Sequence, residues 1–446
     1  MKAAAELVFI PLPGIGHLVP TVEMAKQLVG RDHRLSITFL IMKIPLDKSK
    51  VSSSTQSLLL TAAEDRLKFV YLPQQEAALA ELLSKNPRNF LSEFVNVNKQ
   101  HVRDHVKKMM ISTELTDSSR LAGFVVDMFC TPMMAVAAEF GLPTYAFVTS
   151  GCAFLGLMFH LETLNQYHNQ DVTELKDSDA ELEVPVFVNA VPAKVLPSMV
   201  LSEEEGSTFF MEISKRLRET EGIMVNTFEE LESYAVKCLA KDDKVPPLQV
   251  REIAQALEQS GHRFLWPLRQ PPPKGKFAIP GEYQEDLSQV LPEGFLERTT
   301  KIGKVIGWAQ QAAVQSHKSV GCFVSHYGWN STLESLWCRV PMATWPIYAE
   351  QQMNAFQLVR ELGLAVEIKL DYRKDVETAK VNLVTANEIE NGIRKLMENK
   401  DKSSEGIKQK VKEMSEKSKT AIEEGGSSYN YIERFFEVVM TNVHSP

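Results

Sequence analysis

Short apolar runs alternate with amphipathic stretches along nearly the whole chain, and this alternation restricts the fold more than any other feature. Runs such as LVFIPLP, ITFLIM and GFVVDMF suit buried strands, and stretches such as PTVEMAKQLV carry apolar residues at helical spacing. A strand, helix, strand order predicts parallel strands joined by crossover helices. We therefore expect an α/β protein built on doubly wound parallel sheets.

A chain of 446 residues is too long for one ordinary core and fits two domains. The alternation breaks at KDDKVPP and then resumes, which indicates a short interdomain linker over residues 241–247. We predict an N-terminal α/β domain over 1–240 and a second α/β domain over 248–428. A final amphipathic helix in residues 429–446 is expected to return to the N-terminal domain.

Charge and apolar patterning exclude several classes of protein. A net charge of −8 without any basic run argues against binding to nucleic acid. The apolar N-terminus is broken by Pro11 and Pro13, so we expect no signal peptide. No uninterrupted apolar run approaches the roughly 20 residues that span a bilayer. The five cysteines are scattered and lack metal-ligand spacing, which suits a cytoplasmic protein.

Polar residues follow several of the predicted strands, at the sheet edge where open parallel sheets bind ligands. His17 follows the first strand, Asp127 ends the run GFVV, and Thr149 ends the run TYAFV. The stretch VSHYGWNSTLES, residues 324–335, follows an apolar run of the second domain. These positions are therefore the first candidates for a functional site.

The stretch VSHYGWNSTLES predicts a strand, a glycine turn and a helix N-terminus, with Ser331 or Thr332 as the N-cap. Backbone N–H groups at such a terminus favour an anion, and Gly328 lets the anion approach the chain closely. A phosphate is the natural ligand. The alternative is a capping box between Ser331 and Glu334, which needs no ligand.

His17 stands before a helix that we expect to begin near Pro20, a residue suited to the first helical position. An imidazole beside a helix N-terminus is biased towards its neutral form, which accepts a proton. Asp127 could hydrogen-bond the other ring nitrogen and stabilise the imidazolium. The alternative makes His17 a turn residue and Asp127 a local cap near Thr131 and Pro132.

Other chemistries find less support in the sequence. The glycines Gly14 and Gly16 invite a dinucleotide site, but Val19 stands where the third small residue of that motif belongs. No acidic residue closes the following strand, so a nicotinamide oxidoreductase is disfavoured. There is also no G-x-S-x-G elbow for a serine hydrolase and no His-Cys cluster for zinc.

The 44 residues WAQQAAVQSHKSVGCFVSHYGWNSTLESLWCRVPMATWPIYAEQ, from Trp308 to Gln351, resemble the nucleotide-sugar box of plant secondary-product UDP-glycosyltransferases. PLPGIGHLVPTVEMAKQL and GIMVNTFEELE are similar to the subgroup of that family that acts on flavonoids and other phenolics. The resemblance implies two facing Rossmann-like domains, the GT-B fold. The first domain would bind mainly the acceptor and the second the donor.

For the nucleoside, the resemblance implies that uracil stacks on Trp308 while the backbone of Ala309 and the side chain of Gln311 hold it. Glu334 would accept hydrogen bonds from the ribose hydroxyls. The remaining matches would surround the diphosphate at the helix end. They are His326, Gly328, Asn330 and Ser331.

For the sugar, the resemblance assigns the hydroxyl contacts to Glu350 and Gln351. Glutamine at the second of these positions goes with glucose more often than with galactose. Trp329 would line the sugar pocket with its backbone, and Thr149 would place a hydroxyl near the sugar.

The implied activity is the transfer of glucose from UDP-glucose to a small phenolic acceptor such as a flavonoid, with inversion at the anomeric carbon. His17 would remove the acceptor proton and Asp127 would steady the histidine. No metal or other cofactor is implied, and a monomer is expected. Phe129, Phe147 and Phe154 are candidates for the acceptor pocket, although each could equally be ordinary core.

The chain departs from the family after KVPP. A segment of some tens of residues, including the first strand of the second domain, is absent there. Because neighbouring strands would lose ladder partners, either the second domain rearranges or the site is impaired. We expect a fold that is retained in outline and an activity that is reduced. The alternative function is an impaired relative that binds a nucleotide sugar or a phenol without efficient transfer. A smaller departure is Tyr327, which is expected to add bulk beside the phosphate site.

Overall fold

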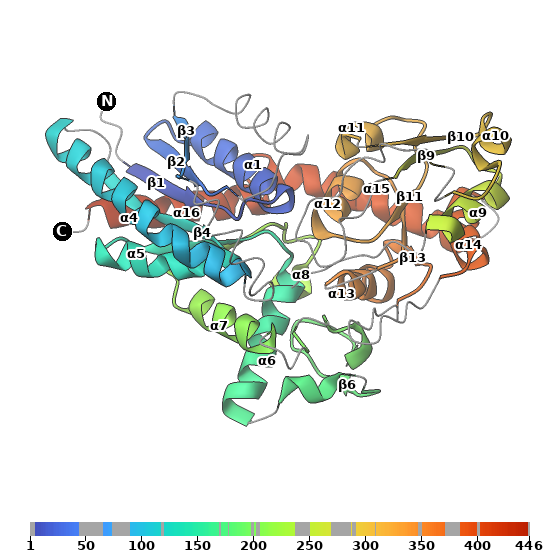
Figure 1. The fold of residues 1–446 in the computed structure, drawn as a ribbon, viewed down its shortest axis with the longest axis horizontal. Coiled ribbons are helices and arrows are strands. Elements are labelled where there is room, and N and C mark those ends of the chain that lie inside the picture. Colours follow the sequence, from blue (N-terminus) through green and yellow to red (C-terminus); the bar gives the residue numbers. More distant parts are fainter. Residues whose placement is uncertain are drawn as a thin grey trace.

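The computed structural model consists of two α/β halves joined side by side, with the N-terminal half on the left of Figure 1. The described residues are 5–43, 66–73, 90–116, 120–168, 171–176, 178–197, 200–201, 206–236, 250–268, 287, 291–307, 309–346, 350–370, 384–398 and 402–444. The predicted linker, residues 241–247, and Trp308 lie outside them.

The N-terminal half contains six parallel strands in the order β3-β2-β1-β4-β5-β8. They are β1 (Ala5–Ile10), β2 (Leu35–Ile41), β3 (Leu67–Tyr71), β4 (Arg120–Asp127), β5 (Thr144–Val148) and β8 (Gly222–Val225). Each coincides with a predicted apolar run. Because β2 and β3 lie on one side of β1 and the later strands on the other, the strand order reverses between β1 and β4. Ligands bind at such a reversal in doubly wound sheets.

Helices cover both faces of this sheet. They bury the apolar side chains of each strand, which point alternately to one face and to the other. Leu7 and Phe9 of β1 pack towards α1 and α16, whereas Val8 and Ile10 pack towards α4 and α5. This period of two explains why the residues of β1 from Leu7 to Ile10 are all apolar. Among the described residues, the helices of this half are α1 (Ile15–Arg31), α4 (Phe90–Thr116), α5 (Met134–Glu139), α6 (Cys152–His168), α7 (Gly206–Arg218) and the short α8 (Ser233–Val236). A small antiparallel pair, β6 (Glu181–Leu182) and β7 (Val191–Pro192), follows α6.

The strands of the C-terminal half form two separate parallel sheets among the described residues. One pairs β9 (Phe264–Pro267) with β10 (Gly303–Ile306). The other has the order β11-β12-β13, made of Phe323–Ser325, Met342–Thr344 and Ala365–Glu367. No residue of β9 is fully buried, and Leu265 is 44% exposed. The ladder groups of this strand are therefore near water, which makes a missing neighbour less costly than in a buried sheet.

One helix connects the two sheets of the C-terminal half. Within α9 (Val250–Ser260), Ala254 packs with Phe264 of β9, and Ala256 packs with Val324 of β11. The other helices of this half are α10 (Phe295–Thr299), α11 (Gln311–Gln315), α12 (Trp329–Trp337), α13 (Gln351–Phe356), α14 (Ala386–Met397) and α15 (Lys402–Ile422). The two sheets thus share one helix, which contributes to a separate hydrophobic cluster beside each sheet.

The last helix, α16 (Ser427–His444), lies along the N-terminal half, as the red ribbon in Figure 1 shows. Phe436 and Val439 are buried in the same cluster as Leu7 and Phe9 of β1. Asn442 donates a hydrogen bond to the hydroxyl of Tyr145 at 2.8 Å. The chain therefore closes the hydrophobic core of its first half with its last residues.

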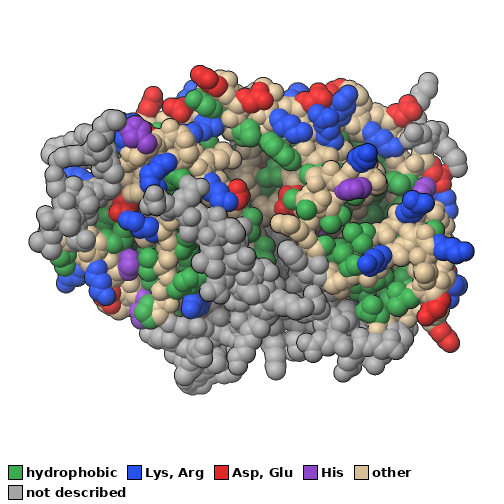
Figure 2. Space-filling view, turned by 90° about the horizontal axis from the view of Figure 1, so that it is seen from above, with side chains coloured by type: hydrophobic (Ala, Val, Ile, Leu, Met, Phe, Trp, Pro, Cys, Tyr) green, Lys and Arg blue, Asp and Glu red, His purple; other side chains and the backbone are tan. Residues whose placement is uncertain are grey.

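The surface seen from above mixes Lys and Arg with Asp and Glu and is hollowed between the two halves (Figure 2). Within the described part of the chain, no helix combines the length and the apolar character needed to cross a membrane.

The packing of α16 gives a stability test. We expect Val439→Ala to lower the free energy of unfolding by about 2 kcal/mol, because it removes two methyl groups from a fully buried site. Val438, 44% exposed on the same helix, is the matched control, and Val438→Ala should change stability by less than about 0.5 kcal/mol. Urea unfolding followed by circular dichroism measures both. Equal losses for the two variants would contradict the docking of α16.

Candidate active site

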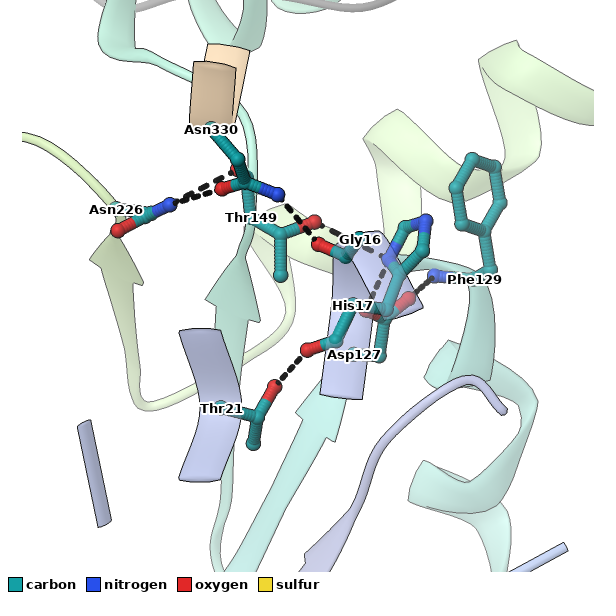
Figure 3. A network of polar contacts seen from close by, with 8 residues as sticks. All are labelled: Gly16, His17, Thr21, Asp127, Phe129, Thr149, Asn226 and Asn330. Atoms are coloured by element: carbon teal, nitrogen blue, oxygen red, sulfur yellow. Dashed lines mark hydrogen bonds and ion pairs between the residues drawn. The ribbon is translucent and has the colours of Figure 1, made fainter. Parts of the chain in front are cut away.

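His17 and Asp127 meet at the point where the strand order reverses, since His17 follows β1 and Asp127 ends β4. The Oδ2 atom of Asp127 lies 2.7 Å from Nδ1 of His17 (Figure 3). The aspartate side chain is fully buried, whereas the imidazole is 24% exposed. A buried carboxylate beside Nδ1 keeps a proton on that nitrogen, so Nε2 is the atom suited to accept another.

Asp127 is also a local cap, which was the alternative interpretation of this residue. Its Oδ1 atom accepts a hydrogen bond from the backbone N–H of Phe129 at 2.9 Å and caps the 3₁₀ turn Met128–Met133. The cap restrains the carboxylate, because one oxygen binds the turn while the other faces His17. Phe129 itself packs edge-on against the His17 ring, with 5.5 Å between ring centroids. Phe147 and Phe154 are core residues of the two clusters on the sheet.

The helix that carries His17 begins earlier than the sequence suggested. The first residue of α1 is Ile15, Gly14 occupies the N-cap, and Pro20 lies inside the helix. The prediction that Pro20 takes the first helical position is therefore wrong. His17 still belongs to the first turn, where the helix dipole favours a neutral imidazole.

Thr149, expected near the sugar, lies at the end of β5 with its hydroxyl 3.1 Å from Nδ1 of His17. The hydroxyl and the Asp127 carboxylate both face this nitrogen, so they fix the ring orientation together (Figure 3). Thr149 is 5% exposed. Whether it also reaches a sugar stays a prediction.

The corner after β11 is built as predicted, although the N-cap differs. The helix α12 begins at Trp329 with Gly328 as its N-cap, and no side chain caps it. The assignment of the N-cap to Ser331 or Thr332 is wrong, because both lie inside the first turn. An uncapped terminus leaves backbone N–H groups available for an anion.

The capping box between Ser331 and Glu334 does not form. The amide of Gln311 donates to Ser331 Oγ at 3.1 Å and to Glu334 Oε2 at 2.8 Å. The three side chains thus form one polar cluster at the start of α11 and α12. The neighbouring Ala309 is half-buried just before α11.

His326 and Gly328 lie next to each other at the helix start. A Cβ atom at residue 328 would come within 3.1 Å of His326 Nε2, so the imidazole would have to shift by a few tenths of an ångström to accept a larger residue there. The surrounding protein lowers the pKa of His326 to about 4 by desolvation, even though the residue is exposed. The imidazole is therefore neutral near pH 7.

Tyr327 does not crowd the helix end as expected. Its side chain is fully buried in the core of the C-terminal half, packed with residues such as Leu336 and Met342. The backbone turns sharply there, with a φ of 71°. This turn sends the ring into the core and leaves the corner open.

Asn330 connects the two halves directly. Its Nδ2 atom donates to the carbonyl oxygen of Gly16 at 2.8 Å, and its Oδ1 accepts from Asn226 Nδ2 at 2.9 Å (Figure 3). Trp329 is 3% exposed, and its indole N–H donates to the carbonyl of Asn226 at 2.8 Å. The uncapped start of α12 is therefore held beside the turn of α1 that carries His17.

The pair Glu350 and Gln351 is buried at the start of α13, each 2% exposed. Asn354 donates to Glu350 Oε1 at 2.8 Å and to the carbonyl of Tyr327 at 3.0 Å, which ties the pair to the corner. The other carboxylate oxygen of Glu350 has no hydrogen-bond partner among the described residues. A buried, unpaired acceptor suits a ligand that brings its own hydroxyl groups.

Comparison with known proteins identifies the family. UDP-glycosyltransferase 71E1 of Stevia rebaudiana is 48% identical to this chain, over 98% of this chain and 99% of that protein. UDP-glucose flavonoid 3-O-glucosyltransferase 6 of Fragaria ananassa is 47% identical, over 99% of this chain and 100% of that protein. The chain belongs to the plant UDP-glycosyltransferases. The family model for UDP-glucoronosyl and UDP-glucosyl transferase also matches residues 242–408.

Solved structures of plant UDP-glycosyltransferases share the fold. A transferase from Siraitia grosvenorii in complex with UDP has a TM-score of 0.81 at 40% identity, covering 98% of this chain and all of that one. UGT71G1 of Medicago truncatula complexed with UDP-glucose has a TM-score of 0.79 at 32% identity, covering 98% of both chains. The predicted GT-B fold is confirmed. The protein is an inverting glycosyltransferase that moves a glucosyl group from a UDP-sugar to a small acceptor.

The relatives carry residues that this glycosyltransferase lacks. The alignment with the Stevia enzyme runs over 487 positions and that with a Malus domestica enzyme over 488, although this chain has 446 residues. Several tens of positions in each relative thus have no counterpart here. Whether these positions include the first strand of the second domain stays a prediction.

Sequence reasoning missed Glu232, a 2% exposed carboxylate between the two halves. It accepts hydrogen bonds from the backbone N–H groups of Cys152 at 2.8 Å and Ala153 at 3.0 Å, at the start of α6. Gln357 of the C-terminal half donates to it at 3.3 Å. A Cβ atom at Gly151 would lie 2.6 Å from the Trp329 ring, so the interface closes tightly here. Glu232 ends the stretch GIMVNTFEELE, but its role could not be inferred from that stretch because its partners come from distant segments.

Burial of Glu232 gives a pH prediction. Desolvation raises its pKa from 4.5 to about 7, so the folded protein holds this proton where the unfolded chain has released it. This carboxyl therefore makes the free energy of unfolding fall as pH rises from about 4.5 to about 7. We expect the difference in unfolding free energy between wild type and Glu232→Gln to fall by about 3 kcal/mol over that range.

Urea unfolding at a series of pH values measures this difference. Glu229→Gln, a partly exposed carboxyl three residues away, is the matched control and should keep the slope of the wild type. An unchanged slope in Glu232→Gln would contradict the assignment.

Proposed function

We propose that this protein transfers glucose from UDP-glucose to a hydroxyl of a small phenolic acceptor such as a flavonoid, with His17 as the general base. The observation that carries the proposal is the buried Asp127 carboxylate 2.7 Å from His17 Nδ1. The pair of His17 and Asp127 lies beside the uncapped start of α12, because Asn330 of that helix bonds to Gly16 in the first turn of α1. A proton acceptor and an anion site thus lie beside each other where the two halves meet.

The reaction follows from these two groups. His17 Nε2 takes the proton of the acceptor hydroxyl as its oxygen attacks the anomeric carbon from the face opposite UDP. The new bond joins that carbon to the acceptor oxygen, and the bond to the diphosphate oxygen breaks with its electron pair. Asp127 stabilises the imidazolium that forms. A phenol suits this base, because its pKa near 10 is within reach of an imidazole.

The diphosphate would leave at the start of α12, where backbone N–H groups and the helix dipole stabilise the added charge. His326 is neutral there and can donate one hydrogen bond, and Ser331 adds a hydroxyl. The family resemblance assigns the ribose to Glu334, the nucleoside to Gln311, Ala309 and Trp308, and the glucose hydroxyls to Glu350 and Gln351. No metal is needed in this scheme. A monomeric state and a cytoplasmic location stay predictions.

His17→Ala tests the base. We expect kcat to fall by about 10²- to 10⁴-fold, because the acceptor proton loses its positioned acceptor. Product formation from UDP-glucose and a flavonol, followed by mass spectrometry, gives the rate. UDP binding by calorimetry serves as the control and should change little, since His17 does not belong to the proposed diphosphate site. Turnover that survives the substitution would refute the assigned role.

A second candidate function is an impaired relative that binds a nucleotide sugar or a phenol without efficient transfer. The division of the C-terminal strands into two sheets and the missing aligned positions favour it. The donor residues lie in this half, so a rearranged sheet would shift them. The intact contact between His17 and Asp127 favours the enzyme.

Reinsertion of the missing segment separates the two candidates. A chimera that receives the corresponding residues of the Stevia relative after KVPP should bind UDP-glucose more tightly and turn over faster. It should also be more stable, because each ladder group that regains a buried partner recovers about 1 kcal/mol. Calorimetry and the flavonol assay measure both quantities. Equal affinity and turnover with and without the segment would show that its loss does not impair the site.

A further inference from the structure

Pro20 occupies an unusual place in the helix that carries His17. It lies in the interior of α1, five residues after the first helical residue, Ile15. Proline has no backbone N–H, and its ring crowds the carbonyl four residues earlier. That carbonyl belongs to Gly16. It therefore lacks the helical donor that any other residue at position 20 would supply.

The same carbonyl accepts a hydrogen bond from the other half of the protein. Asn330 Nδ2, in the first turn of α12, donates to the Gly16 oxygen at 2.8 Å. A Cβ atom added at Gly16 would lie 3.7 Å from the same nitrogen, an ordinary van der Waals contact, so the approach depends on the carbonyl and not on the missing side chain. An acceptor made available by a proline on one helix is thus used by the opposite helix.

A chain of contacts fixes which way the Asn330 amide faces. Asn226 Nδ2 lies 3.3 Å from the carbonyl of Thr149, so this end of Asn226 is a donor. It also donates to Asn330 Oδ1, which directs Asn330 Nδ2 to Gly16. Thr149 in turn contacts His17 through its hydroxyl. Figure 3 shows this chain running from Asn226 to the base.

We propose that Pro20 is a positioning residue for glycosyl transfer. Because Pro20 leaves the Gly16 carbonyl without a helical donor, that carbonyl can accept the hydrogen bond from Asn330. This bond holds Asn330 and the start of α12 against the helix that carries His17. The inference rests on the proposed function of His17. The Asn330 amide donates to Gly16 from the first turn of α12, where the diphosphate is proposed to bind. The geometry of base and leaving group is set by this contact.

Pro20→Ala tests the proposal, because alanine returns an N–H to the helix. The new bond within α1 draws the Gly16 carbonyl back to the helix axis and away from Asn330. We expect kcat with UDP-glucose to fall about three- to tenfold, the range for loss of one neutral hydrogen bond. The KM for the acceptor should change by less than about twofold. The thermal midpoint should not fall, since alanine is the better helix former.

Gly30→Ala on the same helix is the matched control. Gly30 is exposed, and a Cβ atom there meets nothing within 4 Å, so this variant also strengthens α1 without touching Gly16. It should keep the kcat of the wild type. A fall in kcat in both variants would mean that stiffening α1 is the cause, and the proposal would be overturned.

A double-mutant cycle with Asn330→Ala distinguishes a direct link from a separate effect. If Pro20 acts through Asn330, Pro20→Ala should have no further effect on kcat once Asn330 is removed. Additive losses, or a Pro20→Ala variant with unchanged kcat, would overturn the proposal. Pro20→Ser, which also restores the N–H, replaces the alanine variant if that one fails to fold.

A binding measurement separates this inference from the assignment of the base. The affinity for UDP, measured by calorimetry, does not depend on proton transfer. The double-mutant cycle between Pro20 and Asn330 can therefore be repeated with UDP affinity as the measured quantity in place of kcat. We expect Pro20→Ala to weaken UDP binding about two- to threefold, with no further change in the Asn330→Ala background. If His17→Ala retained turnover, the base assignment would fail while this coupling could still be observed. Equal UDP affinity in wild type and Pro20→Ala would count against the seating of Asn330.

Discussion

The contact between the start of α12 and the first turn of α1 is the interaction on which the site depends. Parallel strands collect their carboxyl ends at one edge, and here two such edges face each other. One presents His17 beside the buried Asp127, and the other presents an uncapped helix terminus. Neither edge can join two substrates by itself. The side chain of Asn330 brings them to one place by bonding to Gly16 and Asn226.

Buried polar groups reinforce this junction at a cost in stability. Glu232 is desolvated, and its charge is balanced by the N–H groups at the start of α6 and by Gln357 rather than by a cation. The Trp329 indole closes over Gly151 and bonds to Asn226. Such groups hold the halves in one relative position, because any shift would leave a buried donor or acceptor unpaired. Preorganised geometry of this kind is what a two-substrate transfer requires.

The C-terminal half departs from the continuous sheet of the N-terminal half. Its strands form two sheets that share α9 as a common layer, and the exposed β9 keeps its ladder groups close to water. This arrangement explains how the chain retains a core despite having fewer residues than its relatives. The corner at α12 belongs to the larger sheet, which contains β11 next to β12. The proposed diphosphate site therefore stands on the larger of the two sheets.

The sequence by itself determined where the strands lie, that they pair in parallel in each half, and at which sheet edge the site lies. It could do so because apolar periodicity and the ends of strands are local properties. It also located His17, Asp127 and the corner at Gly328 by this rule. It misjudged where helices begin, placing Pro20 at the start of α1 and Ser331 or Thr332 at the cap of α12. Helix ends depend on which distant groups satisfy the first N–H groups, and a local pattern does not contain that information. Only the tertiary structure decided that Thr149 contacts His17, that Gln311 replaces the capping box, and that Glu232 and Asn330 join the halves. Each of these contacts pairs residues from distant segments, so it exists only once both halves have folded and met.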